Sequence, residues 1–294
     1  MSRIQNILEK AERDGASLRT SRLAVSGAAA ALPVSAPPLP IEPAIIAPAA
    51  AAPAPAATAT SLAPGADASE HYTVRLNPLL VAGLAPKSLA AEQYRALRTR
   101  LAFAEGAGAL RTVLITSPQK GEGKSVTSAN LALTMAQELQ RRVVLVEGDL
   151  RKPSLQHLFG LPAGAGLADY LSGAAELKDI MKFLPEHNLT VIPAGSTPMN
   201  PAELLGSTAM RRMLDHLRTR FDRVILDTPP VLPLADVAIL APLVDGALMV
   251  VRAGYTPKPA IENALRSFDA SRLLGVVLNE SGMEEDYKYE SDAN

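Results

Sequence analysis

The feature that most constrains the fold of this 294-residue chain is a glycine-rich segment set between a strand signal and a helix signal. Ser117–Ser125 reads SPQKGEGKS; it follows the β-branched run Thr112–Ser117 and leads into a predicted helix from Lys124 to about Leu139. Glycines allow backbone N–H groups to approach phosphate oxygens, and the start of the following helix adds a favourable dipole. The segment therefore predicts a phosphate-binding loop, or P-loop.

The residue types of this loop predict separate tasks. Lys124 is expected to bridge the β- and γ-phosphates of a nucleotide, and Ser125 is expected to ligate Mg²⁺. The loop departs from the usual spacing at one position, where Pro118 stands in place of a glycine. The predicted nucleotide-binding residues are Gly121, Glu122, Gly123, Lys124, Ser125 and Val126.

Acidic residues follow two other predicted strands. Arg142–Glu147 runs into EGDLRKP, which holds Glu147 and Asp149, and Arg223–Leu226 runs into Asp227. An open α/β sheet binds its ligand at the carboxyl ends of the strands, so these carboxylates are expected beside the P-loop. Asp227 fits the Walker B acid, which contacts Mg²⁺ directly or through water. The sequence therefore predicts Mg²⁺-dependent chemistry on ATP or GTP.

The remaining apolar runs alternate between strand and helix signals. Further strands are predicted at Leu189–Ile192, Ala247–Val251 and Leu273–Leu278, one long helix at Pro201–Phe221 and another near Pro259–Phe268. The strands are nearly all apolar, as expected when helices cover both faces of a sheet. This pattern predicts an α/β domain over residues 76–282, with right-handed βαβ units and a mainly parallel sheet flanked by helices.

Outside this domain, the sequence predicts a short helix and a linker before it and a tail after it. Residues 1–14 are expected to form a short amphipathic helix, which is either a frayed terminus or a docking helix. Residues 15–75 are rich in alanine and proline, which predicts a disordered linker. Residues 283–294 are expected to form an exposed acidic tail that carries Tyr287 and Tyr289.

Composition argues against several kinds of site and partner. The chain has no cysteine, which excludes disulfides, a thiol nucleophile and Cys-ligated metals. Its four histidines lie far apart in the sequence, so a histidine-based metal site is not expected. A net charge of −1 and a pI near 6.5 argue against bulk electrostatic binding to nucleic acid. No stretch is long and apolar enough to predict a membrane span.

Taken together, the motifs resemble those of the bacterial tyrosine kinases. EGKS in the P-loop, EGDLRKP at 147–153 and ILDTPP at 225–230 are similar to the Walker A, A′ and B motifs of that family. The family serves capsule and exopolysaccharide synthesis and belongs to the deviant Walker A class of P-loop NTPases. The resemblance extends to Gly166–Leu171, to Gly275–Asn279 and to Glu92–Arg98, which fits the ExxRxxR element that forms subunit contacts in a ring.

This resemblance implies a protein-tyrosine autokinase that uses ATP and Mg²⁺ and phosphorylates tail tyrosines in trans within a ring. The implied catalytic residues are Lys124, Asp149, Asp227 and Glu147, and the implied metal ligands are Ser125, Asp149 and Asp227. The implied phospho-acceptors are Tyr287 and Tyr289, and the implied subunit contacts are Glu92, Arg95 and Arg98. A separate membrane chain-length (co-polymerase) protein is the implied partner, which would recruit a cytoplasmic chain to the inner face of the plasma membrane.

Two departures from the family pattern leave alternatives open. Glu147 stands where the family has aspartate, so its carboxylate reaches one methylene further. The tail offers two tyrosines where the family has a cluster, and a merely solvated acidic tail is the alternative. Glu92 and Arg95 also fit an ordinary salt-bridged helix surface. The alternative functions are a non-kinase regulatory or positioning ATPase of the same class and a nucleotide-bound structural adaptor.

Overall fold

The computed structural model describes residues 75–104, 110–233, 235–267 and 269–281. The expected N-terminal helix, all but the last residue of the expected linker, and the tail with its two tyrosines lie outside these ranges. From residue 76 onward, the described ranges fall within the expected α/β domain.

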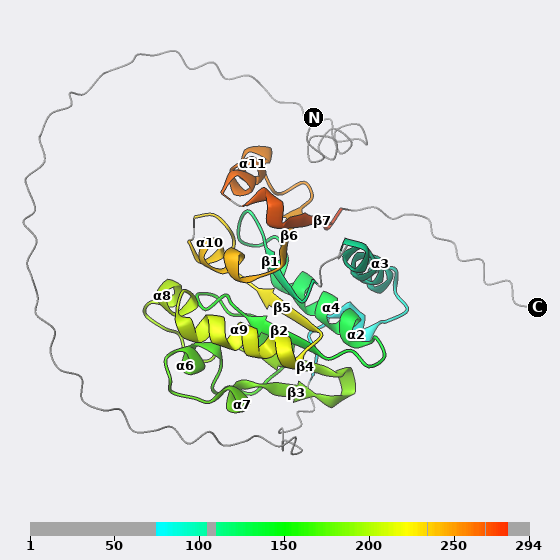
Figure 1. The fold of residues 1–294 in the computed structure, drawn as a ribbon. Coiled ribbons are helices and arrows are strands. Elements are labelled where there is room, and N and C mark those ends of the chain that lie inside the picture. The colour runs from blue at the N-terminus through cyan, green and yellow to red at the C-terminus, as the bar shows by residue number, and fades with distance from the viewer. Residues whose placement is uncertain (1–74, 105–109, 234, 268, 282–294) are drawn as a thin grey trace, which may run out of the picture. The chain divides into compact units, whose positions relative to one another are not determined.

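Seven strands form one sheet in the order β3-β4-β2-β5-β1-β6-β7 (Figure 1). Every neighbouring pair is parallel except β3 and β4, which pair antiparallel at one edge. Strand β1 therefore has the central strand β5 on one side and β6 on the other. The strands are β1 (Thr112–Thr116), β2 (Val143–Glu147), β3 (Lys182–Leu184), β4 (Leu189–Ile192), β5 (Arg223–Asp227), β6 (Gly246–Arg252) and β7 (Leu273–Asn279).

Helices lie on both faces of the sheet (Figure 1). The longer ones are α3 (Leu89–Ala104), α4 (Lys124–Ala136), α9 (Thr208–Arg220) and α11 (Lys258–Arg266). The shorter ones are α2 (Val81–Leu84), α5 (Leu155–Leu158), α6 (Leu167–Leu171), α7 (Leu177–Ile180), α8 (Pro201–Leu205) and α10 (Asp236–Leu240). Three 3₁₀ turns cover Pro185–His187, Ala241–Leu243 and Ala270–Arg272.

Each face of the sheet has its own hydrophobic core, because successive strand side chains point to opposite faces. On one face, Val113 and Ile115 of β1 pack with the buried side of α4. On the other face, Leu114 packs in a cluster that includes Met213 and Leu217 of α9. The mainly parallel sheet with both faces covered is confirmed, and it explains why the strands read as unbroken apolar runs.

The structure differs from the sequence prediction at two of the predicted helices and at one edge of the sheet. The long helix predicted at Pro201–Phe221 is wrong: α8 ends at Leu205, and Ser207 starts α9 by accepting a hydrogen bond from the Met210 N–H at 3.2 Å. A serine at this position satisfies an otherwise unpaired N–H of the new helix, which favours a break over a continuous helix. α4 ends at Ala136, before the predicted Leu139, and the short edge strand β3 was not predicted.

Candidate nucleotide-binding and catalytic site

The P-loop joins the end of β1 to the start of α4, as predicted. Gly121 and Gly123 have φ values of +83° and +87°, a backbone conformation that side chains other than hydrogen disfavour. A Cβ on Gly123 would also lie only 2.2 Å from Nδ2 of Asn279, the last residue of β7. The positive φ at position 123 therefore favours glycine, a side chain there would also displace the Asn279 amide, and the loop closes against the end of a strand distant in sequence.

Lys124 lies among the predicted acids at the first turn of α4. Its Nζ atom is 3.0 Å from Oδ2 of Asp149, 4.0 Å from Oδ2 of Asp227 and 3.1 Å from Oγ of Ser125. Burial alone would lower the pKa of the Lys124 ammonium group, but Asp227 and Asp149 outweigh burial and raise the pKa above its ordinary value. The lysine is thus held in its charged form at the carboxyl ends of the strands.

The acids come from neighbouring strands, and the register of the sheet brings them together. Glu147 of β2 lies directly beside Asp227 of β5. Asp227 Oδ1 accepts a hydrogen bond from Ser128 Oγ at 2.9 Å, whereas its buried Oδ2 has no hydrogen-bond partner. Asp149 Oδ1 accepts a hydrogen bond from the Lys152 N–H at 3.0 Å. The structure therefore assembles the three predicted carboxylates and leaves an acceptor oxygen of Asp227 open.

Glu147 differs from the other two acids because one of its oxygens accepts two backbone hydrogen bonds. Oε2 accepts hydrogen bonds from the N–H groups of Ser154 and Leu155 at 2.8 and 2.6 Å. Burial first, and the neighbouring Asp227 second, raise the pKa of Glu147 well above its ordinary value. The longer side chain thus reaches the start of α5 and holds the loop between β2 and α5.

Glu122 belongs to the P-loop, and its buried side chain holds the loop in place. Its Oε2 accepts a hydrogen bond from the Gln119 N–H at 2.7 Å, and its Oε1 accepts one from the hydroxyl of Thr256, which follows β6. Asn279 Nδ2 donates to the Glu122 carbonyl at 3.0 Å. Glu122 is predicted from the sequence as a nucleotide-binding residue; in the structure its carboxylate is directed to the protein, which leaves its backbone N–H for a phosphate.

An ion pair between Arg151 and Asp236 connects the loop after Asp149 to the segment after β5. Arg151 donates two hydrogen bonds to Asp236 of α10, from Nε at 2.8 Å and from an Nη at 3.1 Å. Asp236 is only 1% exposed, so the pair links a buried carboxylate to the A′ motif at residues 147–153. Neither Thr256 nor Asp236 was singled out from the sequence, because their contacts depend on which strands become neighbours.

The ExxRxxR residues lie on α3, which packs against α4. Arg95 pairs with Glu92 on the same helix and donates to the Pro86 carbonyl at 2.5 Å. Arg98 donates to the Thr134 carbonyl of α4 at 2.8 Å and forms an ion pair with Glu138 at 3.0 Å. Within the described chain, all three side chains have intramolecular partners, and those of Arg98 join α3 to the P-loop helix.

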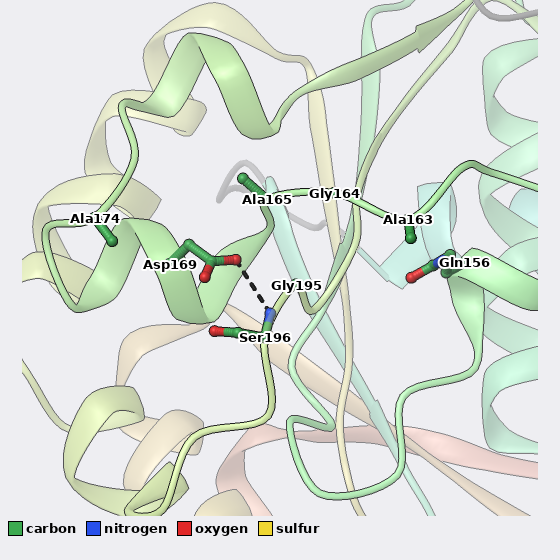
Figure 2. A pocket seen from close by; sticks show the side chains of 8 residues that line it. All are labelled: Gln156, Ala163, Gly164, Ala165, Asp169, Ala174, Gly195 and Ser196. Atoms are coloured by element: carbon green, nitrogen blue, oxygen red, sulfur yellow. Dashed lines mark hydrogen bonds between the residues drawn. The ribbon is translucent and has the colours of Figure 1, made fainter.

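A shallow hollow of about 340 Å³ lies beside the A′ segment, between the loop after α5 and the loop after β4 (Figure 2). Asp169 of α6 closes one side of it, where Oδ2 accepts hydrogen bonds from the N–H groups of Gly166 and Ser196 at 2.8 and 3.1 Å. Burial alone would raise the pKa of Asp169, but hydrogen bonds from the Ser196 side chain and from the Gly166 and Ser196 N–H groups outweigh burial and lower the pKa below its ordinary value. The Gly166–Leu171 motif is thus held to the segment that follows β4.

The site fits a metal that is held jointly by protein and nucleotide. Among the residues that the structure describes, no group of three or more His, Cys, Asp or Glu is arranged to hold a metal by itself. Mg²⁺ is commonly bound through one or two carboxylates together with substrate phosphates and water. The open Asp227 oxygen and the Ser125 hydroxyl beside the P-loop are donors of that kind.

Several known proteins have sequences similar to this one. The sequence profile of a family described as an AAA domain matches residues 110–255. The tyrosine-protein kinase YwqD of Bacillus subtilis (strain 168) is 38% identical over 207 residues, which cover 70% of this chain and 87% of that protein. The chain belongs to the bacterial tyrosine-protein kinase family.

Solved structures of this kinase family have the same fold. The kinase domain of Escherichia coli tyrosine kinase ETK superposes with a TM-score of 0.65 at 30% identity, covering 71% of this chain and 82% of that one. The chimerical protein CapA2B2 superposes with a TM-score of 0.66 at 32% identity, covering 70% of this chain and 91% of that one. The family resemblance seen in the motifs is thereby confirmed. No helix in the described part of this kinase has the length and apolar character needed to cross a membrane.

Proposed function

We propose that this chain is an ATP-dependent protein-tyrosine autokinase that regulates the polymerisation and export of a capsular or extracellular polysaccharide. The observation that carries the proposal is the position of Lys124, between Asp149 and Asp227 behind the P-loop, in a member of the bacterial tyrosine-protein kinase family. A lysine and carboxylates at the ends of adjacent strands suit the transfer of a phosphoryl group, which depends on positioning and charge neutralisation.

In the proposed reaction Lys124 turns from the acids to the β- and γ-phosphates, which are also bound by N–H groups of residues 121–126. Ser125, Asp149 and Asp227 would hold Mg²⁺, which neutralises charge on the phosphates. The acceptor phenol oxygen attacks the γ-phosphorus, the bond to the β,γ-bridging oxygen breaks, and ADP leaves. An acid of the A′ motif, Asp149 or Glu147, would accept the phenol proton; Oε2 of Glu147 is occupied by two backbone N–H groups, whereas its Oε1 has no hydrogen-bond partner in the described chain.

The proposed acceptors are Tyr287 and Tyr289 in the tail of a neighbouring copy. They lie outside the described residues, and the acidic residues around them favour an exposed, extended segment. Transfer between copies requires an oligomer, and Glu92, Arg95 and Arg98 of α3 are the proposed contacts in a ring.

The proposed partner is a separate membrane co-polymerase protein, which would recruit the chain to the inner face of the plasma membrane. In the tyrosine-protein kinase wzc of Salmonella typhi, the matched region is only 30% of the protein, so that relative carries a large additional part. Residues 1–14 are the proposed docking segment, and residues 15–75 give it reach. Deletion of residues 1–70 should abolish partner binding; unchanged binding would contradict this assignment.

The kinase activity is tested by incubating the purified chain with labelled ATP and Mg²⁺ and mapping phosphotyrosine by mass spectrometry. We expect phosphate on Tyr287 or Tyr289 in the wild type and none in Lys124→Ala. ATP hydrolysis without any phosphotyrosine would refute the kinase assignment and favour a regulatory ATPase.

A further inference from the structure

The turn after β6 presents an exposed tyrosine beside the P-loop. Tyr255 is 52% exposed, whereas Tyr94 and Tyr170, the other tyrosines of the described chain, are more buried. The Tyr255 hydroxyl lies 3.9 Å from the position that a Cβ would take on Gly121. Tyr255 can therefore be reached from outside while it adjoins the backbone that binds phosphate.

Arg252 connects Tyr255 to the P-loop. Its guanidinium carbon lies 5.1 Å from the centroid of the Tyr255 ring, and one Nη atom lies 3.4 Å from the Gly121 carbonyl oxygen. Its other Nη atom is 2.5 Å from the Glu280 carboxylate. A guanidinium group binds phosphate more strongly than it binds a carbonyl at this distance, so a phosphate on Tyr255 would compete for Arg252.

The strand order places Tyr255 on the side of the P-loop opposite its own acids. Asp149 and Asp227 follow β2 and β5, whereas Tyr255 follows β6, and β1 lies between β5 and β6. The acids that would accept the phenol proton are thus separated from Tyr255 by the P-loop of the same chain. This arrangement favours modification of Tyr255 by the active site of another copy.

We propose that Tyr255 is a further phospho-acceptor, modified in trans by a second copy of this chain, and that its phosphate weakens ATP binding at the adjacent P-loop. This inference rests on the proposed kinase function. The Tyr255 oxygen bonds to the γ-phosphorus of ATP, the bond to the bridging oxygen breaks, ADP leaves, and the phenol proton passes to an acid of the second copy.

The effect on ATP follows from charge. A phosphotyrosine carries about −1.5 to −2 charges at pH 7, and here it would stand next to the loop that receives the ATP phosphates. Phosphate–phosphate repulsion, reduced by salt and by Arg252, is expected to weaken ATP binding on the order of tenfold. The modification would therefore act as negative feedback on the kinase.

Phosphosite mapping tests the modification itself. The wild-type chain is mixed with a tagged Lys124→Ala chain, ATP and Mg²⁺, and the tagged chain is recovered. We expect phosphate on Tyr255 of the tagged chain and none on Tyr94 or Tyr170. Phosphate on the tail tyrosines without any on Tyr255 overturns this inference alone. The absence of phosphotyrosine from every site overturns the proposed function as well.

A binding measurement tests the consequence. Each chain is phosphorylated, or treated with a tyrosine phosphatase, and titrated with a non-hydrolysable ATP analogue and Mg²⁺. For a chain with Tyr287→Phe and Tyr289→Phe, we expect the phosphorylated form to bind about tenfold more weakly. For Tyr255→Phe we expect the two forms to bind equally. A loss of affinity that persists in Tyr255→Phe, or no loss in the tail variant, would overturn the regulatory role.

Discussion

The hydrogen bond from Thr256 to the buried Glu122 carboxylate, which holds the P-loop in place and is called the brace below, gives a quantitative prediction for Thr256→Val. This change removes the hydroxyl that donates to the buried carboxylate of Glu122 and accepts a hydrogen bond from the Arg252 N–H at 3.1 Å, and it adds no heavy atom. A hydrogen bond to a charged group contributes about 1.5–3 kcal/mol, and 1.4 kcal/mol corresponds to a factor of about ten. Since the loop binds the phosphates before and during transfer, the loss should fall on both states alike. We expect KM for ATP to rise roughly 10- to 100-fold while kcat changes little.

Initial rates of phosphotyrosine formation over a range of ATP concentrations measure this effect. Thr256→Ser keeps the hydroxyl and should stay close to the wild type. Thr219→Val is a matched control, because the Thr219 hydroxyl donates to the His216 carbonyl of its own exposed helix turn, away from the P-loop. If Thr256→Val is folded and keeps the wild-type KM, or loses kcat instead, the reasoning about the brace is wrong.

Three further changes test other contacts of the site and the fold. The raised pKa of Glu147 means that its stabilising protonated form is lost as pH rises through that pKa. Glu147→Gln should therefore raise Tm of the nucleotide-free chain more at pH 8 than at pH 5, and the reverse order would contradict this. Arg151→Met leaves Asp236 buried without its partner and should lower the free energy of unfolding by about 1–3 kcal/mol in urea, with only part regained in Arg151→Lys. An unchanged urea midpoint would show that the pair is not stabilising. Ser207→Ala removes the cap of α9 and should cost about 1 kcal/mol, a fall in Tm of roughly 2–4 °C by calorimetry, whereas no fall would mean that the cap is dispensable.

Local signals in the sequence predict where the P-loop and the acids beside it lie. The P-loop could be predicted because its glycines, Lys124 and the flanking strand and helix are contiguous. The acids could be predicted because each follows an apolar run, and parallel strands end at the same edge of a sheet. The meeting of Glu147 with Asp227 in the structure is the direct result of the pairing of β2 with β5.

Contacts between distant segments could not be predicted in this way. Glu122 and Thr256 are 134 positions apart, and their contact exists only because β6 pairs with β1. Arg98 was placed at a subunit contact by resemblance, yet its partners on the neighbouring helix depend on how α3 packs against α4. The break before α9 lies at Gly206, which ends α8, and at Ser207, which caps α9 with a side-chain hydrogen bond, and an apolar pattern registers neither.

In the proposed function, this chain transfers phosphate from ATP to the tail of another copy. A direct test mixes two variant chains. One is a Lys124→Ala chain with an intact tail, and the other is a Tyr287→Phe, Tyr289→Phe chain with an intact active site. With ATP and Mg²⁺, mass spectrometry should find phosphate on Tyr287 or Tyr289 of the Lys124→Ala chain, and none there when that chain is incubated alone. If the mixture leaves both tail tyrosines unmodified while the second chain binds ATP, the trans-autokinase account is contradicted.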